Sequence, residues 1–328
     1  MDVRPPGMDV STITGCTKRV GYDDSTVAFP VKYQSRISPV ELVDRLRRGI
    51  LFDGPQGTMV GAATNKDWET PEELNLREPD RVRDMHRAYV DAGAEVITTN
   101  SFGGNRIRLT RAGLADQLEA FNRSAAALAR EVAANLLVAG DIGPSGEFLE
   151  PLGDHLYSEF VDAFAEQSRA LADGGVDFLL IETMSDLGEV RTAIEGAKST
   201  GLGVVATMSF CTNMRTMMGV TPADAAREMI EYGADAIGAN CGNGPDEMTE
   251  ILREMREAMP DAVVLGQSNA GMPEIRGRRV VYDCTPDEMA AYAGQWAEFG
   301  VQAIGACCGG TPDTIRAIGE VVEGIRKR

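Results

Sequence analysis

Basic residues are scarce in this chain. Its 328 residues include 32 Lys and Arg against 50 Asp and Glu, which gives a formal net charge of −18. A nucleic-acid-binding surface needs clustered Lys and Arg, and attraction to anionic lipid needs them too. The composition therefore argues against nucleic acid and against a membrane surface as partners.

Long apolar runs are also missing. No stretch approaches the about 18 to 20 apolar residues that a membrane span needs, and residues 1–24 lack the apolar core of a secretory signal. We therefore expect a cytoplasmic protein whose cysteines are reduced. Residues 1–36 are rich in Pro, Gly, Ser, Thr and charge and show no period, so we expect a partly ordered N-terminal arm there.

A regular alternation begins at Ile37. Short, nearly continuous apolar segments are typical of strands buried on both faces, and the longer amphipathic segments after them predict helices. The predicted strands are 49–54, 94–100, 136–143, 177–183, 203–210, 236–241, 262–269 and 303–308. The predicted helices are 78–93, 114–136, 155–175, 186–200, 221–233, 245–259, 285–300 and 311–328.

Eight strands that alternate with eight helices are typical of an α/β protein with a (β/α)8 TIM-barrel fold. The alternative is a doubly wound open sheet, which usually carries a G-x-G-x-x-G phosphate turn after its first strand. Here the first strand runs into DGPQGT at 53–58, which does not fit. We therefore predict one barrel domain over residues 37–328, preceded by the arm at 1–36.

In a TIM barrel the carboxyl ends of the strands converge on one mouth, and the active site lies there. They carry Asp53, Thr99, Asn100, Glu182, Thr183, Asn240, Cys241, Asn269, Cys307 and Cys308. Three of the six cysteines are therefore expected at the mouth. The only two histidines, His86 and His155, fall outside the strand ends, which disfavours a cysteine–histidine nucleophile pair.

Three reduced cysteines at one mouth suit Zn²⁺ with a fourth position open. An iron–sulfur cluster would usually need a fourth cysteine; Cys211 could supply it, but the spacing matches no common cluster motif. Zinc with three thiolates carries a formal charge of −1, so it suits binding of a fourth thiol as a nucleophilic thiolate. We infer alkyl transfer to a small thiol. Asp53 and Glu182 either hold an ammonium group of that thiol or are ordinary rim carboxylates.

Several stretches of the chain resemble the zinc-dependent homocysteine S-methyltransferase family. That family includes the homocysteine-binding module of cobalamin-dependent methionine synthase and the betaine–homocysteine methyltransferases. The stretches run in order from about Val40 to the C-terminus, and the most specific are GANCGNGP and ACCGGTP. They are LFDGPQGT, VITTNSFGGNR, VAGDIGPSGEFLEPLG, LLIETMSDLGEV, IGANCGNGP, SNAGMPE and IGACCGGTPDTI.

The resemblance implies an enzyme that moves a methyl group to homocysteine and so makes methionine. It implies that Cys241, Cys307 and Cys308 bind zinc, with Asn269 as a fourth ligand when the substrate is absent. It also implies that Asp53 and Glu182 recognise the amino group of homocysteine. We add Thr99, Asn100 and Asn240 as substrate contacts, and we expect no catalytic residue beyond the metal site.

The chain also departs from the family pattern. Pro55 and Gln56 stand in the first motif where a small or apolar residue is usual. The shape of the pocket floor is therefore not implied by the resemblance. The stretch 209–219 carries Cys211 and several Met, which makes it a candidate for donor specificity. The extension at 1–36 is not part of the family core.

The methyl donor stays open at the level of sequence. The chain has too few residues for the folate and corrinoid domains of a full methionine synthase. We therefore expect the donor to diffuse into the site or to arrive on a partner protein. One interpretation is a small methyl-onium compound such as betaine, for which Trp68 is a candidate donor-site residue through cation–π contact. The other is a methylcorrinoid carried by a separate protein.

Other functions and the assembly state also stay open. The chain could act on a different thiol, or it could be a non-catalytic protein that binds zinc and thiols. The oligomeric state is undetermined, with a homo-oligomer as one outcome.

Overall fold

The computed structural model describes residues 37–57, 59, 70–277 and 279–327. The predicted arm at 1–36 and Trp68 lie outside the described residues, so both stay predictions. Within the described part, no helix is long and apolar enough to cross a membrane.

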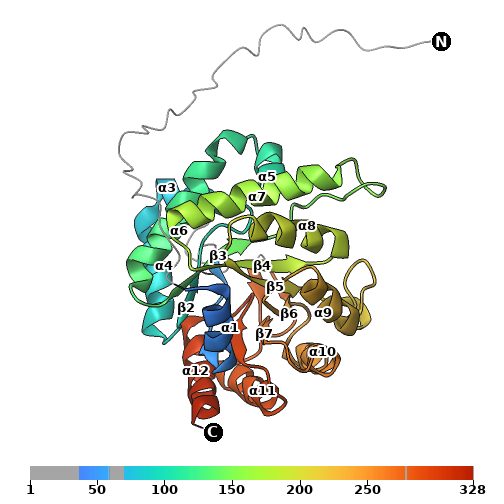
Figure 1. Ribbon diagram of the computed structural model, residues 1–328. Coiled ribbons are helices and arrows are strands. Elements are labelled where there is room, and N and C mark those ends of the chain that lie inside the picture. Colours follow the sequence, from blue (N-terminus) through green and yellow to red (C-terminus); the bar gives the residue numbers. More distant parts are fainter. Residues whose placement is uncertain (1–36, 58, 60–69, 278, 328) are drawn as a thin grey trace, which may run out of the picture. The chain divides into compact units, whose positions relative to one another are not determined.

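Eight parallel strands form a barrel, as the sequence predicts (Figure 1). Their order around the sheet is β1-β10-β7-β6-β5-β4-β3-β2. The two end strands are joined by a bridge between Phe52 and Val96 and by a hydrogen bond from the Glu95 N–H to the Leu51 carbonyl at 2.9 Å. The strands are β1 (Ile50–Leu51), β2 (Val96–Thr98), β3 (Leu137–Ile142), β4 (Phe178–Met184), β5 (Gly203–Met208), β6 (Ala236–Cys241), β7 (Val264–Ser268) and β10 (Ala303–Ala306).

Helices surround the barrel, and all eight predicted ones are present. Thr221, Thr285 and Thr311 cap three of them, each accepting a hydrogen bond from a backbone N–H of the first turn. The eight are α4 (Pro79–Asp91), α6 (Leu118–Ala133), α7 (Tyr157–Gly174), α8 (Leu187–Lys198), α9 (Pro222–Glu231), α10 (Pro245–Ala258), α11 (Pro286–Glu298) and α12 (Pro312–Arg326).

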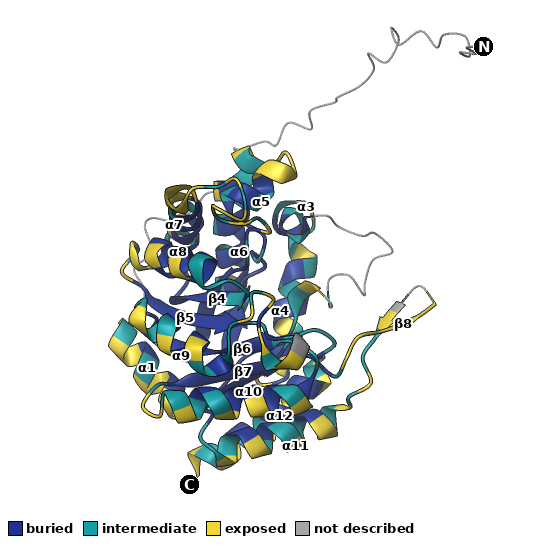
Figure 2. Ribbon diagram, turned by 90° about the vertical axis from the view of Figure 1, so that its right-hand side faces the viewer, coloured by how far each residue is buried: buried dark blue, intermediate teal, exposed yellow. Residues whose placement is uncertain are grey.

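The structure also contains elements that the sequence reasoning did not predict. Most of them precede or interrupt a strand–helix repeat. They are α1 (Pro39–Arg47), the 3-10 helix η1 (Pro71–Glu73), α3 (Leu74–Arg77), α5 (Arg106–Arg111), the 3-10 helices η2 (Ala115–Gln117) and η3 (Thr212–Met214), and a hairpin of β8 (Glu274–Arg276) and β9 (Arg279–Val281). In Figure 2 this hairpin extends away from the barrel.

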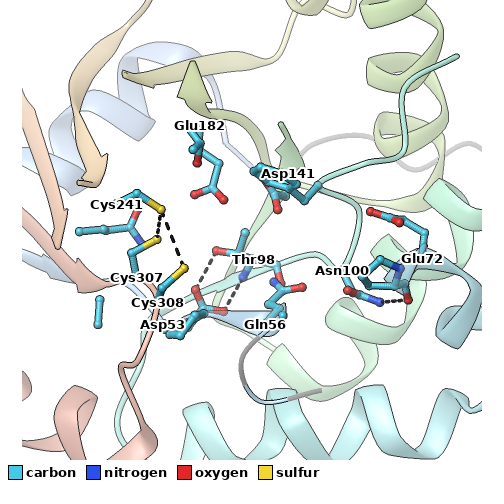
Figure 3. Close-up of a pocket in the computed structure, with 18 of the residues that line it drawn as sticks. Asp53, Gln56, Glu72, Thr98, Asn100, Asp141, Glu182, Cys241, Cys307 and Cys308 are labelled. Atoms are coloured by element: carbon cyan, nitrogen blue, oxygen red, sulfur yellow. Dashed lines mark hydrogen bonds between the residues drawn. The ribbon is translucent and has the colours of Figure 1, made fainter. Parts of the chain in front are cut away.

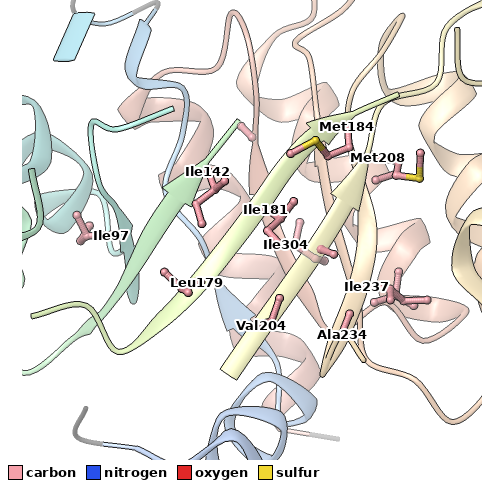
Figure 4. Close-up of a cluster of buried hydrophobic side chains, with 14 of the residues drawn as sticks. Ile97, Ile142, Leu179, Ile181, Met184, Val204, Met208, Ala234, Ile237 and Ile304 are labelled. Atoms are coloured by element: carbon pink, nitrogen blue, oxygen red, sulfur yellow. The ribbon is translucent and has the colours of Figure 1, made fainter. Parts of the chain in front are cut away.

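The core has two layers because side chains alternate along each strand. In β4, Leu179 and Ile181 face the surrounding helices, where they join the cluster in Figure 4. Phe178 and Leu180 point inward and pack in a separate cluster. The inner cluster also contains the apolar face of α1, so this helix covers one end of the barrel interior and leaves the opposite end for the site.

Candidate functional site

Three cysteine sulfurs meet at the carboxyl ends of the strands (Figure 3). Cys241 ends β6, and Cys307 and Cys308 follow β10 directly. The Cys241 sulfur lies 2.8 Å from that of Cys307 and 4.0 Å from that of Cys308. Among the described residues, this is the one group of three or more Cys, His, Asp or Glu whose ligand atoms all lie within 4.8 Å of one another. Cys211 is not part of it.

Strand β7 holds the three cysteines in register because it lies between β6 and β10. The Cys307 N–H donates to the Ser268 carbonyl at 2.8 Å, and the Ala270 N–H donates to the Cys308 carbonyl at 2.9 Å. The Asn269 N–H donates to the Cys241 carbonyl at 3.4 Å. The backbone of all three cysteines is therefore fixed to one segment, 268–270.

The carboxyl ends of β4 and β6 have an unusual backbone. Thr183 and Cys241 have φ values of 62° and 60°, a left-handed conformation that non-glycine residues adopt only at a cost of about 1–3 kcal/mol. The Asn240 side chain holds one of them: its oxygen accepts from the Thr183 N–H, and its nitrogen donates to the Thr183 hydroxyl, both at 2.8 Å. This linkage turns Glu182 and Cys241 toward the same cavity, which both residues line.

The donor set fits zinc. Sulfurs bound to one tetrahedral zinc at about 2.3 Å would lie about 3.8 Å apart. The Cys241–Cys308 distance of 4.0 Å is close to this value, whereas the Cys241 and Cys307 sulfurs, at 2.8 Å, would have to move apart to bind one ion. Hydrogen bonds from Cys241 and Cys307 lower the pKa of the Cys308 thiol to about 3, whereas the hydrogen bond with Cys241 raises the pKa of Cys307. Hydrogen bonds within the trio therefore favour a thiolate at Cys308, and soft sulfur ligands favour zinc.

Asn269, whose backbone contacts Cys241, has an unpaired side-chain oxygen. Its side-chain nitrogen donates to the Gly242 carbonyl at 2.6 Å, whereas its side-chain oxygen is buried without a hydrogen-bond partner. A buried acceptor without a partner is costly, and a cation would satisfy it. The role of Asn269 as a fourth ligand stays a prediction.

A cavity of about 240 Å³ adjoins the cysteines and extends toward the ends of β1 to β4. Its wall carries four carboxyl groups, three of them on buried residues and one on a half-buried residue, and, among the described residues, a single cationic side chain, that of Arg108. The carboxyl groups belong to Asp53, Glu72, Asp141 and Glu182. Such a cavity favours a ligand with a positive charge.

Burial governs the charge of these groups. It raises the pKa of Asp53 to about 7, against two hydrogen bonds that Thr98 donates to its carboxyl oxygens at 2.7 and 2.8 Å. Burial likewise raises the pKa of Glu182 to about 8, with further contributions from the charges of Cys308 and Asp53. Near neutral pH the empty cavity therefore retains protons that a bound cation would displace.

The sequence-predicted substrate residues fall into two groups. Asp53, Asn100 and Glu182 line the cavity. Thr99 and Asn240 are fully buried and do not line it. The Thr99 hydroxyl bonds to that of Ser101 at 2.7 Å, and Asn240 holds the end of β4 at Thr183. The structure gives these two residues supporting contacts, and their contact with substrate stays a prediction.

Sequence reasoning missed three charged residues of the cavity, Glu72, Asp141 and Arg108. Asp141 had a visible signal, because it is a lone acid inside the apolar stretch LLVAGDIG. Glu72 and Arg108 had none: they come from η1 and α5, short elements whose approach to the mouth follows from the tertiary fold.

Tyr282 was also missed. It follows β9 and forms a hydrogen bond with the Cys308 thiol. Its ring packs on Gly309, where an added Cβ would lie 2.2 Å from the ring. The hairpin therefore connects an exposed segment to the cysteine group.

Comparison with known proteins identifies the family. The family model described as homocysteine S-methyltransferase matches residues 50–322, which include every cysteine of the mouth. The chain belongs to the homocysteine S-methyltransferase family. The resemblance drawn from the sequence motifs is thereby confirmed.

Relatives and solved structures agree with this assignment. The chain is 34% identical over 309 residues to a methionine synthase of Mycobacterium tuberculosis and 33% identical over 305 residues to one of Mycobacterium leprae. These matches cover 88% and 86% of this chain but 26% and 25% of the relatives, so the chain spans about a quarter of their length.

The fold is similar to that of the homocysteine methyltransferase MmuM of Escherichia coli. Its metallated form aligns with a TM-score of 0.71 at 23% identity, over 86% of this chain and 99% of that one. Its apo form aligns with a TM-score of 0.66 at 21% identity, over 87% and 100%. This similarity supports the TIM-barrel fold.

Proposed function

We propose that the chain catalyses zinc-dependent transfer of a methyl group to homocysteine, giving methionine. One observation carries the proposal: three cysteine sulfurs within 4.8 Å of one another form a wall of a cavity lined by buried carboxyl groups. Sulfur ligands match a thiol-binding metal, and carboxylates match the ammonium group of an amino acid. Membership of the family supports both assignments.

In this proposal Cys241, Cys307 and Cys308 hold Zn²⁺, and Asn269 supplies a further oxygen when no thiol is bound. Zinc bound in this way lowers the pKa of a thiol ligand, so that the thiol binds as a nucleophilic thiolate. The β7 segment keeps the cysteine backbones fixed, so the site requires little rearrangement on binding.

Asp53 and Glu182 orient the substrate. Thr98 fixes the Asp53 carboxyl group through both oxygens, which leaves their remaining lone pairs for an ammonium group. Binding of the ammonium places the thiol end of the amino acid toward the cysteines. The homocysteine sulfur then attacks the methyl carbon of the donor, the bond from that carbon to the donor breaks, and the leaving group keeps the electron pair.

Two donor classes remain in the proposal. The relatives named methionine synthase are about four times as long as the chain, which favours a methylcorrinoid presented by a separate domain or partner. A small methyl-onium compound is the second candidate, and the acidic cavity favours it. Trp68 remains the proposed aromatic contact for such a donor.

A donor screen tests the function. Zinc-loaded protein is incubated with homocysteine and, separately, with betaine, a dimethylsulfonium compound, S-methylmethionine or methylcobalamin, and methionine is measured. We expect methionine from at least one donor, and the same reaction with Cys308→Ala should give none. Zinc and homocysteine binding without methionine from any donor would instead favour a non-catalytic zinc- and thiol-binding protein.

A further inference from the structure

The four carboxyl groups of the cavity differ in how far their oxygens are already engaged. Asp53 receives two hydrogen bonds from Thr98. The Glu72 carboxyl group accepts a hydrogen bond from the Gly103 N–H and interacts with the charge of Arg108. Glu182 has only a long contact of 3.5 Å from the Asn240 side chain. These differences decide which oxygens remain for a ligand.

Asp141 stands apart because one of its carboxyl oxygens, Oδ1, is buried without any hydrogen-bond partner. The residue is only 4% exposed, it lies in β3, and it lines the cavity. In Figure 3 its carboxyl group and that of Glu182 point into the cavity. Glu182 is also the charged neighbour with the largest effect on Asp141.

The backbone of Asp141 is held by hydrogen bonds on both sides, so the unpaired Oδ1 does not result from a poorly fixed backbone. Its N–H donates to the Thr99 hydroxyl at 2.9 Å, and its carbonyl accepts from the Ser101 hydroxyl at 2.8 Å. The Gln167 side chain donates to the same carbonyl at 3.2 Å. A rigid strand thus presents a buried acid with one carboxyl oxygen unpaired, which is costly unless a ligand satisfies that oxygen.

We propose that Asp141 is a third carboxyl group of the amino-group subsite, which holds the ammonium of the thiol substrate together with Glu182 and Asp53. The inference rests on the proposed function. An ammonium group has three N–H donors and needs three acceptors, and these three side chains supply them from β3, from β4 and from the end of β1.

The subsite makes the free amino group a condition for tight binding. A primary α-ammonium thiol satisfies all three carboxyl groups, whereas a thiol whose amine is missing or acylated leaves them unpaired. The protein is therefore expected to select amino-acid thiols and to reject peptides in which the thiol residue is acylated. Asp141 acts here as a specificity residue.

The test measures thiol affinity by calorimetry on zinc-loaded protein. The ligands are homocysteine and 4-sulfanylbutanoate, which lacks the amino group. Asp141→Asn keeps the size of the side chain and should weaken homocysteine binding about tenfold or more, as expected for loss of a charge-assisted hydrogen bond. It should leave the affinity for 4-sulfanylbutanoate unchanged. Glu189→Gln, a buried acid outside the cavity, is the matched control and should change neither affinity.

Two results would overturn the inference. Equal losses for both ligands in Asp141→Asn, or no loss for either, would show that Asp141 does not contact the amino group. Asp141→Ala, checked for zinc content and unfolding temperature, gives a second variant with the same expectation. Wild-type protein that binds zinc but not homocysteine would refute the proposed function itself, and this outcome is distinct from a failure of Asp141 alone.

Discussion

At the scale of single residues, the site combines side chains that would be unfavourable elsewhere. Cys241 has a left-handed backbone, Asp141 has an unpaired oxygen, and Asp53 is almost fully buried. Strain and unpaired polar groups of this kind cluster where a ligand is meant to bind. Several residues that are unfavourable for stability thus line the same cavity.

The cysteine assignment leads to the first prediction. Cys308→Ala should remove bound zinc and methyl transfer together, because two sulfurs and one amide oxygen make a poor zinc site. Cys284→Ala is the matched control: Cys284 is also a free, half-buried thiol but lies outside the group of three. Zinc content by atomic absorption checks both. A Cys308→Ala protein with full zinc content would contradict the ligand set.

A second prediction concerns His86, which is fully buried in α4 with no hydrogen-bond partner at either ring nitrogen. Burial lowers its pKa from 6.5 to about 4. The unfolded chain therefore takes up a proton below pH 6.5 that the folded chain cannot accept. Stability is lost as the pH falls from 6.5 toward 4, by about 2–3 kcal/mol at pH 4.5.

His86→Leu removes that proton uptake, so its free energy of unfolding should decline less between pH 7 and pH 4.5 than that of wild type. Urea unfolding at the two pH values measures the difference. Equal declines in the two proteins would show that His86 does not contribute to acid sensitivity.

At the scale of elements, α1 contributes to the barrel interior rather than to its outer ring. Leu42 and Leu46 are buried among the inward-facing strand residues. Gly203, at the start of β5, leaves room for this contact, since an added Cβ would lie 2.5 Å from a methyl group of Leu42. The helix thus closes the end of the barrel opposite the site.

Leu42→Ala should therefore cost about 2–5 kcal/mol of unfolding free energy, as large-to-small changes in a core do. Val40→Ala in the same helix is the control, because Val40 is 72% exposed and should cost little. Denaturant unfolding distinguishes them. Similar small losses in both variants would mean that α1 is not packed as described.

The comparison of sequence with structure is clearest at this scale. The strand at 236–241 and the helix at 221–233 could be predicted because burial on both faces and amphipathic spacing leave a direct trace in the residues. The β8–β9 hairpin could not, because Ile275 and Val280 pair mainly with each other and leave no trace of a buried face. The cysteines could be predicted from strand ends, whereas Tyr282 and Glu72 reach the site from irregular segments whose path depends on the whole fold.

At the scale of the whole molecule, the described strands and helices of the barrel all lie between residues 39 and 326. The buried core of the described part begins at Ile37, and every residue of the site follows it. Removal of residues 1–36 should therefore leave the unfolding temperature and the zinc content unchanged. Thermal denaturation and metal analysis of the shortened chain test this, and a lower unfolding temperature would show that the arm supports the barrel.

The cysteine group also joins distant parts of the chain. Cys241 and Cys307 are 66 positions apart, and β7, the hairpin and α11 lie between them. A metal held by both cysteines would act as a reversible cross-link around that loop, and by chain-entropy reasoning such a link is worth up to about 4 kcal/mol. A protease that cuts the exposed hairpin would then leave two fragments joined both by the pairing of β10 with β1 and β7 and by the metal. A chelator should lower the temperature at which these fragments separate.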